Sequence, residues 1–76
     1  MTRLLMSVGR EHRISPGDVV GVILGAVKIA KECVGAIHLL DKQTLVDVSD
    51  DHANQVLKKL NGIKFKGRKL SVKLAG

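Results

Sequence analysis

The sequence predicts an α+β domain of the ferredoxin-like class, β-α-β-β-α-β, in which two helices cover one face of a four-stranded antiparallel sheet. Two observations lead to this fold class. Segments with alternating apolar residues, typical of strands, and segments with apolar residues three and four apart, typical of helices, follow one another in that order. The chain has 76 residues, which are enough for one packed core and too few for two, and it is 45% hydrophobic and 26% charged. We therefore expect a single domain over residues 1–76.

The first strand and the start of the first helix are both marked in the sequence. Alternating apolar residues predict a strand at Leu4–Val8, followed by a charged loop at residues 10–13. Ser15 is a favourable N-cap, Pro16 suits the first helical turn, and Asp18 follows the serine at the capping-box spacing. These signals predict that the first helix begins directly after Ser15.

The first helix has a wide apolar face formed by Val19, Val20, Ile23, Ala26 and Val27. It also contains Gly21 and Gly25, each of which weakens a helix by about 1 kcal/mol relative to alanine. Residues four apart lie on one side of a helix, so we expect this side to pack closely against the sheet. The uninterrupted apolar run ends after Val27 and is too short to span a bilayer.

The centre of the chain predicts two strands joined by a turn. Residues 29–34 are expected to form a loop with a single helical turn. Gly35 then opens a strand at Ala36–Leu40, residues 41–43 reverse the chain, and a third strand follows at Thr44–Val48.

The second helix is predicted by its two ends and by its apolar spacing. Ser49 is its expected cap, Asp50 and Asp51 lie in the first turn, and Lys58 and Lys59 lie in the last turn, all favourable to the helix dipole. A single buried stripe is expected from Ala53, Val56, Leu57 and Leu60.

The C-terminal segment predicts a short extended piece at residues 63–65, a turn at 66–67 and a last strand at Lys69–Leu74. Alternation along the four strands then assigns side chains to the two faces of the sheet. The face under the helices is expected to hold Leu4, Met6, Ile37, Leu39, Val46, Val48, Leu70, Val72 and Leu74. The opposite face is expected to show Leu5, Ser7, His38, Leu40, Leu45, Asp47, Lys69, Ser71 and Lys73.

The positive charge of the chain is concentrated at its C-terminal end. Residues 58–76 contain seven basic residues and no acid, whereas residues 1–57 contain six basic and seven acidic residues. The whole net charge of +6 therefore comes from one segment. Phosphate is the polyanion that such a surface favours, because lysine and arginine displace its condensed counterions. The alternative is an ordinary solvated charge run, and we expect Lys28 and Lys31 to be solvated in that way.

Several classes of site are not indicated by the sequence. Cys33 is the only cysteine, which excludes an internal disulfide and a cysteine-based zinc cluster, and a reducing intracellular location fits this usage. The three histidines stand on different elements without metal-ligand spacing. Glu11 and Asp18 are interpreted as loop and cap residues and not as an acid–base pair. We expect no catalytic residue, cofactor, metal, membrane segment or small-molecule substrate.

The segment Leu60–Val72 resembles the last third of an RNA recognition motif. That family places aromatic residues on the sheet face, where RNA bases stack on them. At those positions this chain has Leu5, Gln43 and Leu45, and Phe65, its single aromatic residue, is expected to lie off the sheet face. We therefore expect RNA binding without the usual aromatic platform.

The whole chain resembles a narrower family, the DbpA-like accessory RNA-binding domain at the C-terminus of bacterial DEAD-box RNA helicases. The resemblance rests on Val8-Gly9-Arg10, on Val20-Gly21 and on Val34-Gly35-Ala36-Ile37, in this order and spacing. It implies a non-catalytic domain that binds structured RNA, in some members a hairpin of large-subunit ribosomal RNA. It further implies that the domain tethers an ATP-driven helicase core in cis to that RNA. Residues 1–76 are then a fragment of a longer, cytoplasmic helicase chain.

The best candidates for RNA contacts are Arg68, Lys69 and Lys73, on one basic edge. Arg10 and Arg13 flank the start of the first helix, where free N–H groups also favour an anion, and together they predict a second phosphate site. The full set of expected contacts is Arg3, Leu5, Arg10, Arg13, Lys42, Gln43, Leu45, Lys66, Arg68, Lys69 and Lys73.

Two other functions are compatible with the predicted fold. One is a protein-interaction domain that uses the leucine-bearing sheet face, formed by Leu5, Leu40 and Leu45, with a basic tail that serves solubility. The other is a small enzyme of the acylphosphatase type, which needs an anion-binding loop with arginine and a water-positioning asparagine. Asn54 and Asn61 both fall on or at the end of the second helix, which disfavours the enzyme.

Overall fold

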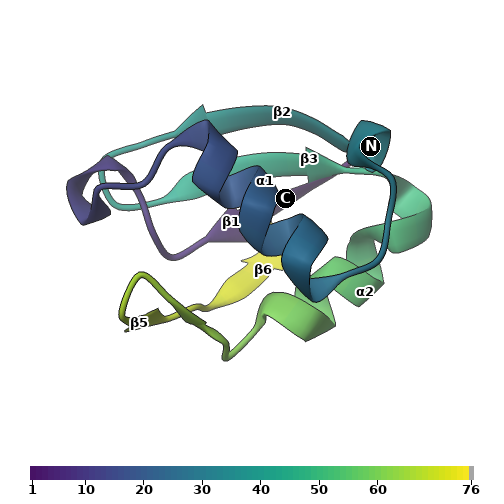
Figure 1. Ribbon diagram of the computed structural model, residues 1–76. Coiled ribbons are helices and arrows are strands. Elements are labelled where there is room, and N and C mark those ends of the chain that lie inside the picture. The colour runs from purple at the N-terminus through teal and green to yellow at the C-terminus, as the bar shows by residue number, and fades with distance from the viewer. Residues whose placement is uncertain (76) are drawn as a thin grey trace.

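The computed structural model describes residues 1–75, and Figure 1 shows two helices on the same face of an antiparallel sheet. The strand order is β2-β3-β1-β6. The strands are β1 (Thr2–Met6), β2 (Val34–Leu39), β3 (Thr44–Val48) and β6 (Val72–Leu74), and the helices are α1 (Pro16–Ala26) and α2 (Asp50–Leu60). Short 3₁₀ turns, η1 (Arg10–His12) and η2 (Lys31–Cys33), precede α1 and β2. The ferredoxin-like fold is confirmed, and Gly76 lies outside the described residues.

The hydrophobic core lies between the sheet and the helices. Leu4 and Met6 of β1 and Val46 and Val48 of β3 are fully buried, and the residues between them face outward. The predicted alternation is therefore confirmed in the two central strands. Thr44 is also buried in this layer, and its hydroxyl donates a hydrogen bond to the Val8 carbonyl at 2.6 Å, so its polar group is satisfied.

Both helices begin where the sequence predicts, but their caps differ. The Ser15 N–H donates to Asp18 Oδ2 (2.9 Å) and the Asp18 N–H donates to Ser15 Oγ (3.3 Å), which confirms the capping box. Ser49 stands at the N-cap of α2 without a side-chain cap bond. Thr2 Oγ1 donates instead to Asp50 Oδ1 at 2.6 Å, which ties β1 to the start of α2. The predicted stripe of α2 is buried at Ala53, Val56 and Leu60 and half-buried at Leu57.

The interpretation of the two glycines in α1 was wrong. Gly21 and Gly25 are exposed, and a Cβ atom built on either glycine has no neighbour within 4 Å. They lie on the solvent side of α1, while Val19 and Ile23 are buried against the core. Equal spacing on a helix fixes which residues share a side, but not which side meets the sheet.

The prediction of one last strand at Lys69–Leu74 was also wrong. Lys64–Phe65 (β4) and Arg68–Lys69 (β5) form a separate two-stranded ribbon. Lys66 and Gly67 turn its tip with φ values of 53° and 79°, as in the primed turns that suit hairpins. Only β6 joins the sheet. Leu74 at its end was predicted to lie under the helices, but it is 56% exposed.

The first two strands begin earlier than predicted, at Thr2 and at Val34. A register shift between Val34 and Ile37 interrupts the pairing of β2 with β3. No helix within residues 1–75 combines the length and the hydropathy needed to cross a membrane.

Candidate nucleic-acid interface

The open face of the sheet, opposite the helices, carries a central row of side chains that crosses all four strands. The strand register pairs His38 of β2 with Leu45 of β3, Leu45 with Leu5 of β1, and Leu5 with Lys73 of β6. The two leucines are half-buried, and His38 and Lys73 are exposed. The centre of the open face is therefore a pair of leucines with a lysine at the β6 edge.

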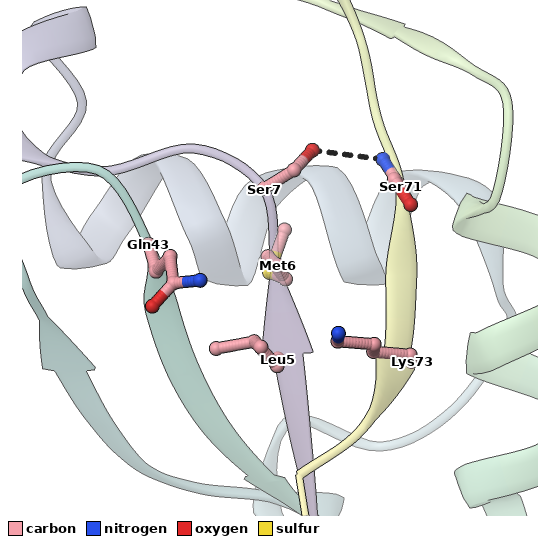
Figure 2. A pocket seen from close by; sticks show the side chains of 6 residues that line it. All are labelled: Leu5, Met6, Ser7, Gln43, Ser71 and Lys73. Carbon is pink, nitrogen blue, oxygen red and sulfur yellow. Dashed lines mark hydrogen bonds between the residues drawn. The ribbon is translucent and has the colours of Figure 1, made fainter.

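Next to this row, the open face is hollowed where β1 ends and β3 begins (Figure 2). Ser7 and Ser71 hold the edge of the hollow together, since the Ser7 N–H donates to the Ser71 carbonyl (3.0 Å) and the Ser71 N–H donates to Ser7 Oγ (2.9 Å). Figure 2 shows the Leu5 side chain extending toward β3 and the Lys73 side chain toward β1. The hollow has a volume of about 160 Å³ and is lined by Leu5, Met6, Ser7, Gln43, Ser71 and Lys73.

On the other side of the central row, Arg3 and Asp47 form an ion pair. Arg3 Nε lies 2.9 Å from Asp47 Oδ1, and Nη2 lies 3.4 Å from Oδ2. The hydrogen bonds from Arg3 hold the pKa of the Asp47 carboxyl below its ordinary value. Arg3, a predicted RNA contact, is therefore engaged with Asp47, and the pair neutralises an acid on the open face.

A second cationic surface is the basic ribbon, which we define as residues 64–69. It contains Lys64, Lys66, Arg68 and Lys69, all exposed. Phe65 is half-buried and packs against the core, which confirms that the single aromatic residue lies off the open face. Lys66 Nζ lies 3.8 Å from Asp18 Oδ1, so the tip of the ribbon reaches the N-terminal end of α1.

The loop before α1 holds Arg10 and Arg13, the two arginines of the predicted phosphate site, in different surroundings. Asp18 already places a carboxylate at the N-terminus of α1, where the hydrogen bond from the Ser15 N–H lowers its pKa. The Arg10 guanidinium donates from Nε and Nη2 to the Leu39 carbonyl at 3.2 and 3.0 Å. Arg13 is exposed, with a left-handed backbone at φ 59°. Arg10 thus anchors the end of β2, and Arg13 stays available to a ligand.

Gly9 explains why this loop can lie against the β2–β3 turn. The Arg10 N–H donates to the Leu40 carbonyl (2.8 Å) and the Glu11 N–H donates to the Asp41 carbonyl (3.0 Å). A Cβ atom on Gly9 would lie 2.6 Å from both Asp41 O and Gln43 N. The absence of a side chain at Gly9 therefore allows direct backbone contact between the two loops.

The structure thus groups the predicted contacts into two clusters. Leu5, Gln43 and Lys73 meet at the hollow, with Leu45 adjacent to it. Lys66, Arg68 and Lys69 belong to the basic ribbon. Lys69 was expected on the open face of the sheet, but the ribbon places it off that face. Lys42 is exposed in the β2–β3 turn. The outward alternation of Ser7 and Ser71 was visible in the sequence, but not their approach to Gln43, which depends on strand order.

Comparison with known proteins bears on the use of these surfaces. A family model described as "DbpA RNA binding domain" matches residues 3–74, nearly the whole chain. An uncharacterized protein of Treponema pallidum (strain Nichols) is 31% identical over 71 residues, which cover 93% of this chain and 31% of the relative. The chain therefore spans about a third of the length of that relative.

Proposed function

The chain belongs to the DbpA RNA binding domain family, and from this premise we propose that it tethers a DEAD-box helicase core to structured RNA. RNA binding is the role of the family. The proposal adds that the bound RNA is structured and that its binding holds a helicase core on it. In this proposal the domain has no catalytic activity of its own, and an ATP-dependent helicase core lies in the same cytoplasmic polypeptide. Large-subunit ribosomal RNA is the foremost candidate ligand.

The observation that carries the preference for folded RNA is the absence of aromatic side chains on the open face. Leu5 and Leu45 occupy its centre, and Phe65 packs against the core. Stacking on aromatic residues, worth about 1–3 kcal/mol per base in single-strand binders, is then missing. Cations of the basic ribbon and Lys73 remain as the main source of affinity, and they recognise phosphates, whose arrangement in space is fixed when the RNA is folded.

We therefore expect tighter binding to a ribosomal RNA hairpin than to an unstructured oligonucleotide of equal length and charge. The measurement is a titration of the labelled RNAs at two salt concentrations. Equal or tighter binding to the unstructured strand would contradict the proposal. If the leucine-bearing face instead serves to dock another protein, no RNA binding with a steep salt dependence is expected. Apolar contacts release no counterions, so salt should weaken them little.

A second prediction concerns the two arginines before α1. Replacing Arg13 with alanine should reduce the slope of log K against log salt by about 1, because one phosphate contact is lost. Replacing Arg10 should lower the melting temperature as well, because its guanidinium holds the Leu39 carbonyl. Because the Arg10 guanidinium is already engaged, the double variant should lose no more slope than Arg13→Ala alone, about 1. An unchanged slope in the Arg13 variant would mean that this loop is solvated surface.

A further inference from the structure

The Asn61 side chain lies on the free edge of β6 and binds it as a neighbouring strand would. Asn61 Nδ2 donates a hydrogen bond to the Val72 carbonyl (3.0 Å), and the Val72 N–H donates to Asn61 Oδ1 (3.4 Å). Ser71, the residue before Val72, turns its carbonyl toward β1, so Val72 turns its backbone groups the other way. The side-chain amide therefore pairs backbone groups that the edge of a sheet otherwise leaves open.

Asn61 also stands between the two cationic surfaces of the domain. It is the C-cap residue of α2, and the basic ribbon begins three positions later. At the other end of the ribbon, Leu70 leads the chain back to Val72, and Lys73 follows on the open face. The Gly62 N–H donates to the Leu70 carbonyl (2.8 Å), which closes the base of the ribbon. The Asn61 amide thus joins the start of the ribbon segment to the strand that carries Lys73.

Few other directional contacts hold the ribbon against the sheet. In the described part of the chain, Asn61 is the only member of residues 61–70 whose side chain hydrogen-bonds to a strand of the four-stranded sheet. Lys66 at the tip forms an ion pair of 3.8 Å with α1, and partly exposed pairs of this kind contribute little. Phe65 and Leu70 pack against or within the core, but apolar burial has no preferred direction. The amide is therefore the contact that fixes an angle.

We propose that Asn61 is a positioning residue for RNA binding, whose amide holds the basic ribbon at the angle at which the ribbon and Lys73 grip one folded RNA together. The inference rests on the proposed binding of structured RNA and adds the side chain that lets both surfaces act at once. Asn61 itself touches no phosphate in this proposal. A group that is already held in its bound orientation loses less conformational entropy on binding, so its contact contributes more to affinity.

Asn61→Ala should therefore weaken binding although every cation is still present. We expect the affinity for a ribosomal RNA hairpin to fall about tenfold, the low end for one contact to a charged group. The slope of log K against log salt should decrease by about 1, because one phosphate contact is lost. The titration is made well below the melting temperature of each variant, so that only folded protein is compared. Hydrogen exchange of the Val72 N–H, which should be faster in the variant, checks that the edge contact is lost.

A double-mutant cycle separates positioning from stability. In the parent protein, Lys73→Ala should lower the affinity about tenfold, because Lys73 and the ribbon grip the RNA together. In the Asn61→Ala background the same change should cost no more than about twofold, about the accuracy of such cycles, because the joint grip is already lost. A residue that only stabilised the fold would lower the melting temperature and leave the cost of Lys73→Ala unchanged.

The matched control is Asn54→Ala, which removes an exposed asparagine from α2 and should change neither affinity nor slope. If Asn61→Ala melts too low to be titrated, Asn61→Asp keeps the acceptor for the Val72 N–H and loses the donor to its carbonyl. It should bind more weakly than Asn54→Asp, the control of equal charge.

The proposal is overturned if the Asn61 variant keeps the affinity and slope of its control, or if Lys73→Ala costs the same in both backgrounds. In either case, binding of the hairpin by the parent protein would still support the tethering of structured RNA. A parent protein that binds no folded RNA would reject the tethering proposal and this one with it.

Discussion

Lys69→Glu combined with Lys73→Glu should reduce the affinity for a structured RNA roughly a hundredfold and leave the fold intact. The two lysines lie on different surfaces, Lys69 in the basic ribbon and Lys73 on the open face of the sheet. Hydrogen bonds to charged groups contribute about 1.5–3 kcal/mol each, so two lost phosphate contacts correspond to about 3 kcal/mol. Both side chains are exposed, and their replacement removes no core contact. Titration with RNA at low salt and a thermal melt measure the two effects.

The matched control for this charge reversal is Lys28→Glu combined with Lys31→Glu. These lysines are also exposed, and they follow the C-terminal end of α1, whereas the tip of the basic ribbon reaches its N-terminal end. The net charge changes by the same amount, so a nonspecific charge effect would appear equally in both variants. Comparable losses of affinity in the two double variants would contradict a localised interface. A large drop in melting temperature of the Lys69/Lys73 variant would contradict their assignment as surface contacts.

The fold could be predicted from the sequence because most of its signals are local. The capping box of Ser15 and Asp18 is confirmed by two hydrogen bonds, and β3 begins and ends where alternation predicts. The division of the last strand could not be predicted in the same way. Lys66-Gly67 marks a turn, but the pairing of Arg68–Lys69 with Lys64–Phe65 and not with β1 is a choice between two tertiary partners.

The sheet face on which a candidate site residue lies could be predicted from the sequence more fully than its contacts. Alternation identified Leu5, Leu45 and Lys73 as outward-facing, and the strand register joins them in one row. Arg3 and Arg10 were both predicted as RNA contacts, yet their guanidinium groups are engaged, with Asp47 and with the Leu39 carbonyl. Their partners are more than twenty residues away in the chain, so no local pattern could indicate them.

Glycines show the same difference between local and tertiary causes. Gly21 and Gly25 appeared to be packing residues because of their spacing, but a Cβ atom there meets no neighbour. Gly9 carries no spacing signal, and its φ of −149° is an extended conformation that any residue can adopt. Glycine is needed at this position only because the backbone of the β2–β3 turn leaves no space for a Cβ atom. The Val8-Gly9-Arg10 motif therefore has a physical cause that only the folded chain makes visible.

Gly9→Ala should destabilise the domain by about 3 kcal/mol, the upper end of the usual cost of overpacking, because the added methyl meets rigid backbone atoms. These atoms include Asp41 O and Gln43 N at 2.6 Å, and they cannot move away as a flexible side chain would. For a domain of this size the melting temperature should fall by about 12–24 °C. Gly21→Ala is the matched control, and it should stabilise the domain by about 1 kcal/mol through helix propensity. If both alanine variants melt at or above the temperature of the parent, the two loops do not touch, and Gln43 is not held in place beside the hollow.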